Sequence, residues 1–573
     1  MRLAGLYGLA SLSGAPLPAA DLAVLDLDAA DGPFVAAARD PDAPPGEVRR
    51  AAFEEDRLLL LGRLDDAAAL AAELGSSLAD PAALALAALR RWGTEARARM
   101  SGEWSLAWWQ GAERTLTLGV SDNLRDPLLF ARNGDHVAFA PDLRVLAGLG
   151  WIHGAIDPEG FAYAVGRAPL RLARNGRTVV RGVTALAAGT WARIDRSGER
   201  IADAPTITPA AWSGGFDDAV ADLEHMLRGS VRRAIAGRAR IGVLLSGGFD
   251  SSLLAAIAAE ELGAGQSLTC FTSAAPAGSG LPDELAFSRM VADRHGLKVI
   301  GVGPPPEPSL YLPGAETFAL SGPIPSPRHY LYAAFADAGR HAGIEVMLDG
   351  IGGEATITRK IAALGRHNLP GIPRQFARRL LGRVASPDGL FHPRLAGDFV
   401  ASLPLSVRAF SMPRWPWLPP IGGSLFDPRV QLQQLQEAIT AVPGRGYRQA
   451  FPFRDRALLR LGAAIPARFV DWRGVPRAIA RAMLAGKVPE AIRRRRSGLP
   501  ISPDYRLRMR RDLPSLQEAL PHWRGLGVGA VIDLDWLEAA AKAQAVGGDS
   551  SAGADMQLGA TAHAAGFIAG WRA

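Results

Sequence analysis

The hydrophobic pattern divides the chain into two regions. Up to about residue 205, short apolar runs follow one another at close spacing, which is typical of antiparallel strands. The expected strands are 58–61, 104–109, 115–120, 128–131 and 136–140. Asn133-Gly134 favours a hairpin between the last two of them. A helix is expected over 81–91, since Asp80 can cap its start and Gly93 follows its end.

From about residue 215, apolar strand-like runs alternate with helical stretches. Strands are expected at 240–245, 267–272, 298–302 and 344–348, and helices at 220–236, 252–262, 283–295 and 330–341. Such alternation indicates βαβ units and a doubly wound parallel sheet. The sequence therefore predicts an α+β domain over 1–205 and an α/β domain with helical additions over 215–573. Within the latter, 365–425 is expected to be an irregular insertion rich in Pro, Trp and Arg.

Composition narrows the class of protein. With 573 residues and 48% hydrophobic residues, the chain is expected to be globular rather than disordered. A single cysteine excludes an internal disulfide and a cysteine-rich metal site. The net charge of +7 permits an anionic ligand without indicating a nucleic-acid partner. No apolar run is long enough to cross a bilayer and no secretory signal is evident, so we expect a cytoplasmic protein with no membrane partner.

One polar segment stands out between the strand ending at Leu245 and the helix after it. It reads Ser246-Gly247-Gly248-Phe249-Asp250-Ser251-Ser252. A helix that follows a strand presents unpaired N–H groups and the positive end of its dipole, which favours phosphate. The segment is neither a Walker loop nor a GxGxxG fingerprint. A carboxylate at Asp250 would repel phosphate, which a bridging Mg²⁺ explains. The alternative is a plain Ser/Gly-rich turn with Asp near a helix cap.

This segment resembles the pyrophosphatase loop of ATP-pyrophosphatase enzymes, and nearly the whole chain resembles the asparagine synthetase B family. Further matches are Phe271-Thr272-Ser273, Asp283-Glu284, the LDGIGGE run at 348–354, the AFPFRD run at 450–455 and the arginine-rich run at 493–498. In the N-terminal part, matches to the family's glutaminase domain are the GRLD run at 62–65, RWG at 91–93, GEWS at 102–105 and SDN at 121–123.

The resemblance implies an N-terminal Ntn-hydrolase-like sandwich whose glutaminase activity is lost. Glutaminases of this family use a cysteine thiol at position 2 as the nucleophile, and here position 2 is Arg2. The lone cysteine, Cys270, falls inside an expected strand of the second region. We therefore expect that this domain makes no ammonia, and that the amine comes from another source.

The resemblance also implies a set of site residues with ATP and Mg²⁺ as cofactors. The residues expected to bind ATP or pyrophosphate are Leu244, Ser246, Gly247, Gly248, Asp250, Ser251, Ser252, Phe271, Thr272, Gly350, Gly352 and Gly353. Asp250 and Glu354 would hold Mg²⁺, although the family usually has Asp-Glu where this chain has Glu354-Ala355. Arg496 stands where a Lys often lies near the reacting phosphate.

The identity of the proton acceptor is less determined. Ile351 occupies a position where asparagine synthetases tend to carry Glu and β-lactam synthetases Tyr, and it cannot accept a proton. His329, Asp349 and Glu354 are the candidate bases, and AMP itself is another. For His329, a capping or surface histidine is the structural alternative. In the arginine run 493–496, we expect Arg496 to face phosphate and the others to be solvated.

The combination most resembles lasso-peptide cyclases, which join the N-terminal amine of a core peptide to an Asp or Glu side chain. The implied partners are a precursor core peptide, a leader peptidase and a leader-recognition protein. Two alternatives stay open: a β-lactam-synthetase-like or ammonia-dependent amide ligase, and a non-catalytic protein that binds ATP or peptide.

Overall fold

The computed structural model describes most of the chain. The described residues are 4–28, 32–39, 48–65, 67–123, 128–166, 176–202, 208–303, 309–314, 317–318, 322–358, 391–408, 446–496, 502–545 and 552–572. The chain forms two compact units. One comprises 1–160, 175–207 and 426–439, and the other comprises 161–174, 208–425 and 440–573. The expected division between 205 and 215 coincides with the main change of unit, but residues 161–174 group with the second unit.

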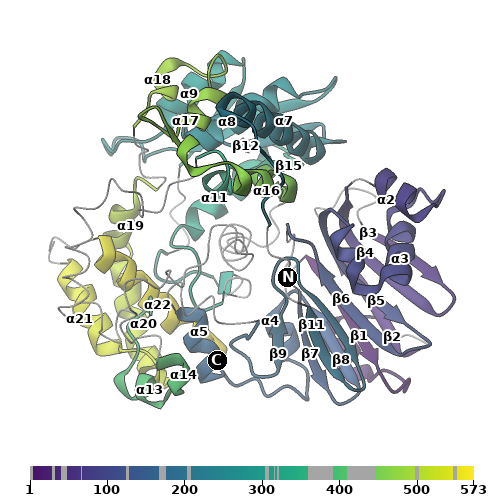
Figure 1. Cartoon of the computed structure of the whole chain (residues 1–573). Helices are drawn as coiled ribbons and strands as arrows, with labels where there is room; N and C mark the ends of the chain where they lie inside the picture. The colour runs from purple at the N-terminus through teal and green to yellow at the C-terminus, as the bar shows by residue number, and fades with distance from the viewer. Residues whose placement is uncertain are drawn as a thin grey trace. The chain divides into compact units, whose positions relative to one another are not determined.

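The first unit contains two antiparallel sheets (Figure 1). One sheet has the order β2 (Phe34–Arg39), β1 (Gly5–Ser11), β8 (His136–Ala140), β7 (Leu129–Asn133) and β9 (Val183–Ala185). The other has the order β11 (Gly198–Ala202), β10 (Trp191–Asp195), β6 (Thr115–Val120), β5 (Gly102–Gln110), β4 (Asp56–Leu64) and β3 (Val48–Phe53). The two sheets pack face to face. Between them, Phe34 of β2 stacks on Trp109 of β5 with ring centroids 5.7 Å apart.

The helix and the hairpin that local sequence signals predict are both present in this unit. Helix α3 (Pro81–Trp92) begins after Asp80, whose side chain accepts a hydrogen bond from the Ala83 amide, and ends at Gly93. The helix buries its leucines against the six-stranded sheet and so forms one core. The predicted hairpin joins β7 and β8, but Asn133 pairs with His136, so the turn is shifted by one residue. Gly134 supplies the positive φ, at 58°. The shorter helices are α1 (Ala19–Leu25), α2 (Ala67–Leu74) and α4 (Leu143–Ala147).

The second unit is built on a five-stranded parallel sheet. Its order is β14 (Lys298–Val302), β13 (Ser267–Ser273), β12 (Arg240–Leu244), β15 (Val346–Leu348) and β16 (Arg448–Ala450), and every neighbouring pair is parallel. The predicted parallel sheet is therefore confirmed, while β16 was not expected. The chain runs outward from β12 in one direction and from β15 in the other. Ligands of such sheets bind where this reversal occurs, beyond the carboxyl ends of the strands.

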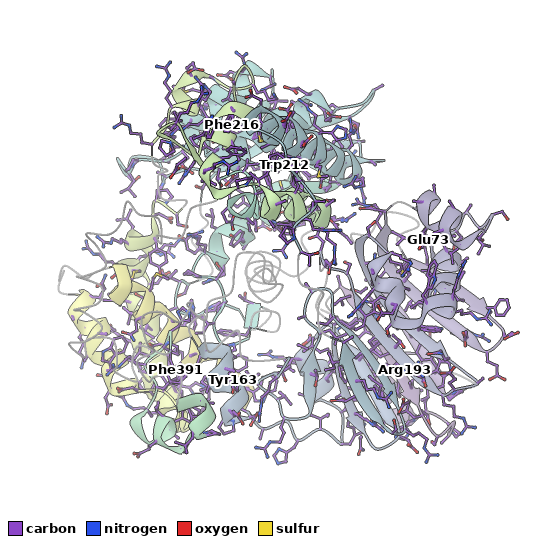
Figure 2. The ribbon with its side chains drawn as sticks, in the orientation of Figure 1. Glu73, Tyr163, Arg193, Trp212, Phe216 and Phe391 are labelled. Carbon is purple, nitrogen blue, oxygen red and sulfur yellow. The ribbon has the colours of Figure 1, made fainter. Side chains whose placement is uncertain are left out.

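Helices accompany this sheet. They are α7 (Phe216–Ile235), α8 (Phe249–Glu260), α9 (Leu285–Arg294), α11 (His329–His341), α16 (Arg456–Ala464) and α17 (Ala478–Met483). Apolar residues of most of these helices and of the central strands form one buried cluster. An aromatic group of Trp212, Phe216, Phe469 and Trp472 packs beside it, with Phe216 stacked on Trp472 at 5.6 Å and both rings edge-on to Phe469. Figure 2 labels Trp212 and Phe216, which is the first residue of α7.

The end of the chain is helical, as the sequence predicts. The helices are α18 (Glu490–Arg493), α19 (Tyr505–Arg511), α20 (Leu513–Gly525), α21 (Leu534–Ala545) and α22 (Ala552–Arg572). In α5 (Pro158–Val165), Phe161 contacts Phe399 of α13 (Gly397–Ser402) and Phe567 of α22. Of the expected insertion 365–425, residues 391–408 are described, including α13 and α14 (Leu405–Arg408), and the rest lies outside the described residues. No helix among the described residues is long and apolar enough to span a bilayer.

Candidate functional site

Two loops meet where the strand order reverses, one after β12 and one after β15. Helix α8 begins at Phe249, three residues before the expected start, so Asp250, Ser251 and Ser252 belong to its first turn. The difference arises because Gly248 adopts an extended conformation, φ −73° and ψ 165°, and is itself the N-cap. The turn thus places a carboxylate among the unpaired N–H groups of a helix start.

Gly247 permits the close packing of this turn. Its φ is +67°, and a Cβ there would lie 2.5 Å from Cβ of Phe287. The hydroxyls of Ser246 and Ser251 lie 3.0 Å apart, and Ser251 Oγ accepts from the Ser246 amide at 3.2 Å. Ser252 is fully buried, and its hydroxyl has no hydrogen-bond partner among the described residues. The predicted phosphate-binding residues therefore form one compact turn.

The loop after β15 approaches Asp250 closely. A Cβ on Gly353 would lie 2.3 Å from Asp250 Cγ, and a Cβ on Gly350 would lie 3.3 Å from the Ser251 amide nitrogen. Thr358, which no sequence signal singled out, places its Oγ1 2.9 and 3.0 Å from the two carboxylate oxygens of Asp250. The structure therefore brings the predicted residues of both loops together, because glycine at 350 and 353 leaves room for the carboxylate.

The electrostatics of this junction are unusual. Burial raises the pKa of the Asp250 carboxyl to about 7, the Thr358 hydrogen bond opposes this rise, and the nearby Glu354 charge adds to it. Arg477 lowers the same pKa by its charge. On the other side of Glu354, burial lowers the pKa of the Arg454 guanidinium to about 10, against the attraction of Glu354. Two half-buried carboxylates thus lie close enough for the charge of one to raise the pKa of the other, and such a pair of donors favours a cation.

Asp349 shapes the second loop. Its Oδ1 accepts from the Ile351 amide at 3.0 Å, and its Oδ2 accepts from Gln449 Nε2 of β16 at 2.8 Å. The side chain is 7% exposed. Glu354 Oε2 accepts from the Gly352 amide at 3.2 Å, where Gly352 has a φ of 101°. Both acidic side chains therefore hold the turn that follows β15.

The arginine run after α18 supplies one residue to the β12 loop. Arg495 Nη1 donates to the carbonyl of Gly247 at 3.0 Å, Nη2 binds Glu284 at 2.9 Å, and the guanidinium lies 4.0 Å from the Phe287 ring centroid. Sequence reasoning expected Arg495 to be solvated, but its side chain is only 8% exposed. Arg496, expected to face phosphate, is exposed. Its role at phosphate therefore stays a prediction.

A second arginine pair flanks the same turn from α17. Arg477 and Arg481 lie over the Phe249 ring, at 5.7 and 4.8 Å from its centroid. Arg481 donates to the carbonyls of Arg493 and Arg495, which ties α17 to the arginine run. Burial lowers the pKa of Arg481, and repulsion from Arg477 and its other arginine neighbours lowers it further. Positive charge is therefore concentrated beside the turn, as an anionic ligand requires.

The residues expected near adenine lie along β12 and β13. Phe271 pairs with Leu244 in the parallel ladder and is fully buried. Thr272 is 2% exposed, and its Oγ1 lies 3.0 Å from Ser288 Oγ, which donates to the Leu245 carbonyl at 2.7 Å. These contacts join β13 to α9 at the carboxyl edge of the sheet. Binding of a nucleotide by these residues stays a prediction.

His329 has a different environment from that of the loop residues. It is 1% exposed, and its two ring nitrogens lie 3.2 and 3.3 Å from the carbonyls of Ser326 and Ser309. Its ring contacts His563 at 5.5 Å, and burial lowers the pKa of His329 to about 4. These contacts connect it with the C-terminal helices rather than with Asp250, so the structure favours neither surface exposure nor a cap for this histidine.

The residues present fit Mg²⁺ brought by a nucleotide. Among the described residues, no three His, Cys, Asp or Glu side chains gather closely enough to hold a metal ion by themselves. Mg²⁺ is commonly held by one or two carboxylates together with substrate phosphates and water, and Asp250 with Glu354 supplies such a pair. The close approach of the Gly353–Glu354 turn to Asp250, and the rise in the Asp250 pKa that the charge of Glu354 adds to, support the fit.

Two family models match parts of the chain. Residues 222–380 match the family model described as asparagine synthase, and residues 76–203 match the glutamine amidotransferase domain. The first match covers both loops of the site, and the second falls in the two-sheet unit. One part of the two-sheet unit is thus similar to glutamine amidotransferase domains, and one part of the α/β unit is similar to asparagine synthase.

A curated relative points the same way. Asparagine synthetase [glutamine-hydrolyzing] 3 of Bacillus subtilis (strain 168) is 23% identical over 169 residues, which is 29% of this chain. The match spans 27% of that relative, about a quarter of its length. Together with the two domain matches, this distant relative supports the asparagine synthetase family.

Two solved structures show a weaker likeness. The glutamine phosphoribosylpyrophosphate amidotransferase from B. subtilis, complexed with ADP and GMP, has a TM-score of 0.22 and 11% identity, over 52% of this chain and 60% of that one. A structure titled as the allosteric regulatory enzyme of purine biosynthesis has a TM-score of 0.23 and 12% identity, over 61% and 74%. TM-scores this low do not establish a shared fold.

Proposed function

We propose that the chain is an ATP-dependent carbon–nitrogen ligase that activates a carboxylate as an acyl-adenylate. The observation that carries the proposal is the meeting of the β12 and β15 loops, which sets Asp250 against Gly353 and Glu354 at the switch point of a parallel sheet. A glycine-rich helix start for phosphate and two carboxylates for a cation are the parts that adenylation needs. The asparagine synthase match covers both loops.

The reaction would proceed in two balanced steps. A carboxylate oxygen of the substrate attacks the α-phosphorus of ATP, the bond to the β-phosphate oxygen breaks, and pyrophosphate leaves. An amine then attacks the acyl carbon, the acyl–phosphate bond breaks, AMP leaves with that bonding pair, and the amine loses one proton. Holding the acyl-adenylate and the amine in one site makes the second step effectively unimolecular.

The residues of the loops divide this work. The turn Ser246–Ser252 binds the pyrophosphate through amides and hydroxyls, and Arg495 keeps the turn in place through the Gly247 carbonyl. Asp250 and Glu354 would hold Mg²⁺, which neutralises charge that develops on the leaving pyrophosphate. Phe271 and Thr272 line the adenine side at the end of β13. Arg496 adds positive charge for the phosphates.

For the proton of the amine, Glu354 is the side chain we favour. Both oxygens of Asp349 already accept hydrogen bonds that hold the loop. Both ring nitrogens of His329 lie at backbone carbonyls, those of Ser326 and Ser309, and its ring contacts His563 of α22. Glu354 uses one oxygen on the Gly352 amide and lies beside Asp250, so its second oxygen either holds Mg²⁺ with Asp250 or, once the cation has left with pyrophosphate, accepts the proton.

As to the substrate, we propose a peptide that carries both the carboxylate and the amine, so that the product is a macrolactam of the lasso type. Support comes from Arg2 in place of a nucleophilic cysteine, which removes glutamine as the nitrogen source, and from Ile351 where ammonia- and β-lactam-forming relatives carry a proton acceptor. The partners would be a precursor core peptide, its leader peptidase and a leader-recognition protein.

The test is incubation with ATP, Mg²⁺ and the linear core peptide encoded beside the gene. We expect a product lighter by one water, with AMP and pyrophosphate released in equal amounts. Release of ADP would overturn adenylation. Formation of an amide with added ammonia but not within the peptide would overturn the macrolactam and leave the ligase. Asp250→Ala is the matched inactive control.

A further inference from the structure

Thr358 is the hydroxyl that contacts the buried carboxylate of Asp250. Its Oγ1 lies 2.9 Å from Oδ1 and 3.0 Å from Oδ2, and the residue is 5% exposed. A hydroxyl carries one proton, which it donates to one of these oxygens or shares between them. Among the described residues, no other side chain or amide donates to this carboxylate, so Thr358 alone fixes its rotation by a hydrogen bond.

The backbone of Thr358 is tied to the same loop that closes on Asp250. Its amide donates to the Gly353 carbonyl at 3.0 Å, and Gly353 is the residue whose missing side chain leaves room for Asp250 Cγ. The 3-10 turn Gly353–Ala355 therefore sets the distance between the two side chains. The position of the hydroxyl is determined by the loop after β15, while the position of the carboxylate is determined by α8.

We propose that Thr358 is a positioning residue, which orients the Asp250 carboxylate toward the divalent cation that accompanies ATP. The inference rests on the proposed function, because that function makes Asp250 a ligand of the cation. Because the hydroxyl binds the carboxylate, the remaining lone pairs keep a fixed direction. The carboxylate is therefore already oriented when the metal binds. Removing the outer hydrogen bond of a metal ligand generally weakens metal binding by about 10–100-fold.

The test replaces Thr358 by Val, which has the same shape and lacks the hydroxyl. Binding is measured with Mn²⁺ and ATP, by following free Mn²⁺ in electron paramagnetic resonance titrations, so that the readout does not depend on turnover. We expect the dissociation constant of Mn²⁺ in the presence of ATP to rise about tenfold or more. Thr358→Ser keeps the hydroxyl and should restore the constant to within about threefold of the original chain.

Thr356 offers a matched control in the same loop. It is 3% exposed, and its Oγ1 lies 3.3 Å from the Gly353 carbonyl and 3.5 Å from the Gly352 carbonyl, where it does not contact Asp250. Thr356→Val should leave Mn²⁺ binding unchanged. Equal weakening in both valine variants would mean general damage to the loop and would overturn the assignment to Thr358, as would unchanged binding in Thr358→Val.

Two further measurements separate the possible failures. If Thr358→Val does not fold, as judged by its thermal transition, Thr358→Ala removes the same hydroxyl without adding a methyl group in place of the oxygen. An original chain that binds Mn²⁺–ATP but forms no AMP would contradict the proposed function and leave the role of Thr358 standing. If Mn²⁺ binding in the original chain is the same as in Asp250→Asn, the inference is wrong.

Discussion

Two titratable groups of the second unit, the half-buried Asp250 and the buried His329, have opposite surroundings. Burial raises the pKa of Asp250 to about 7, and the charge of Glu354 raises it further. The hydrogen bond from Thr358 lowers the same pKa. Burial lowers the pKa of His329 to about 4, and each of its ring nitrogens lies at a backbone carbonyl. Its neighbour His563, with a pKa lowered to about 3, likewise faces the Leu310 carbonyl at 2.6 Å.

The difference separates a structural role for the histidine pair from the role that we propose for Asp250. Burial keeps His329 and His563 neutral, so this pair buries no charge. The two rings provide polar contacts between α11 and the C-terminal helices. Asp250 is left close to its titration point, beside a like charge, in a position where a bound cation would relieve both. Burial of an ionisable group is therefore not by itself the mark of a functional site, whereas a carboxylate whose pKa is raised beside a second carboxylate, at the start of a helix, is a candidate for one.

The strongest test of this contrast is Asp250→Asn. Because Asp250 is proposed to hold the cation, we expect turnover to fall by about 10³-fold or more. The ligand-free protein should nevertheless gain stability at pH 8. The carboxyl pKa is higher in the folded chain than in the unfolded one, so native stability falls as pH rises from about 4 through 7, and asparagine removes that fall.

Thermal unfolding in metal-free buffer at pH 5 and pH 8 measures this effect. The variant should show a smaller difference between the two pH values than the original chain, by an amount on the order of a few kcal/mol in unfolding free energy. An asparagine variant that is less stable at pH 8 would show that Asp250 is a compensated, structural carboxylate. The contrast with His329 would then be lost.

The next largest effect is expected at Arg495, a buried charge that does have a partner. Arg495→Met leaves Glu284, 5% exposed, without this ion pair, which should cost about 3–5 kcal/mol. It should also weaken ATP binding, because the Gly247 carbonyl loses its donor. Chemical unfolding and ATP binding at equilibrium measure the two losses separately.

Variants of the neighbouring Arg494 and Arg496 serve as comparisons for Arg495→Met. Arg494 is 78% exposed and, among the residues that the structure describes, its ion pair is with Glu490 at the surface, so Arg494→Met should change neither quantity. Arg496→Met should weaken ATP binding with little change in stability, if this exposed arginine acts on phosphate as the sequence predicts. Loss of stability without loss of ATP binding in Arg495→Met would reduce that residue to a structural link.

The sequence predicted the architecture, and which loops meet, better than the contacts inside the candidate site. Strand–helix alternation and the SGGFDSS run indicated the parallel sheet and the turn after β12, because both depend on local patterns. Thr358 and Arg495 were missed, since each reaches Asp250 or Gly247 from far along the chain and neither carries a local signal. The start of α8 was placed three residues late, because a glycine N-cap is a weaker signal than serine.

His329→Gln tests the structural half of the comparison. Since the pKa of His329 is lower in the folded chain, native stability should be complete above pH 6.5 and decline as pH falls toward 4. Glutamine should flatten this decline, and turnover at pH 8 should stay within about threefold of the original. Thermal transitions between pH 4 and 8 provide the measurement. A 100-fold loss of turnover with an unchanged stability profile would make His329 the base after all.

The smallest effect is expected at Cys270, a third buried titratable group, which lies on β13 directly before Phe271. Burial raises the pKa of its thiol to about 12, so the group is neutral and burial carries no charge, as for His329. It belongs to the apolar cluster of the sheet rather than to either loop. Cys270→Ala should therefore lower stability by about 1 kcal/mol, through a small cavity, and leave turnover within about twofold.

Iodoacetamide should not modify the folded chain, because a nucleophilic thiolate is absent at neutral pH. An inactive alanine variant, or rapid alkylation with loss of turnover, would show that the one thiol of this chain takes part in the chemistry. Burial as a neutral group would then no longer distinguish structural residues from catalytic ones.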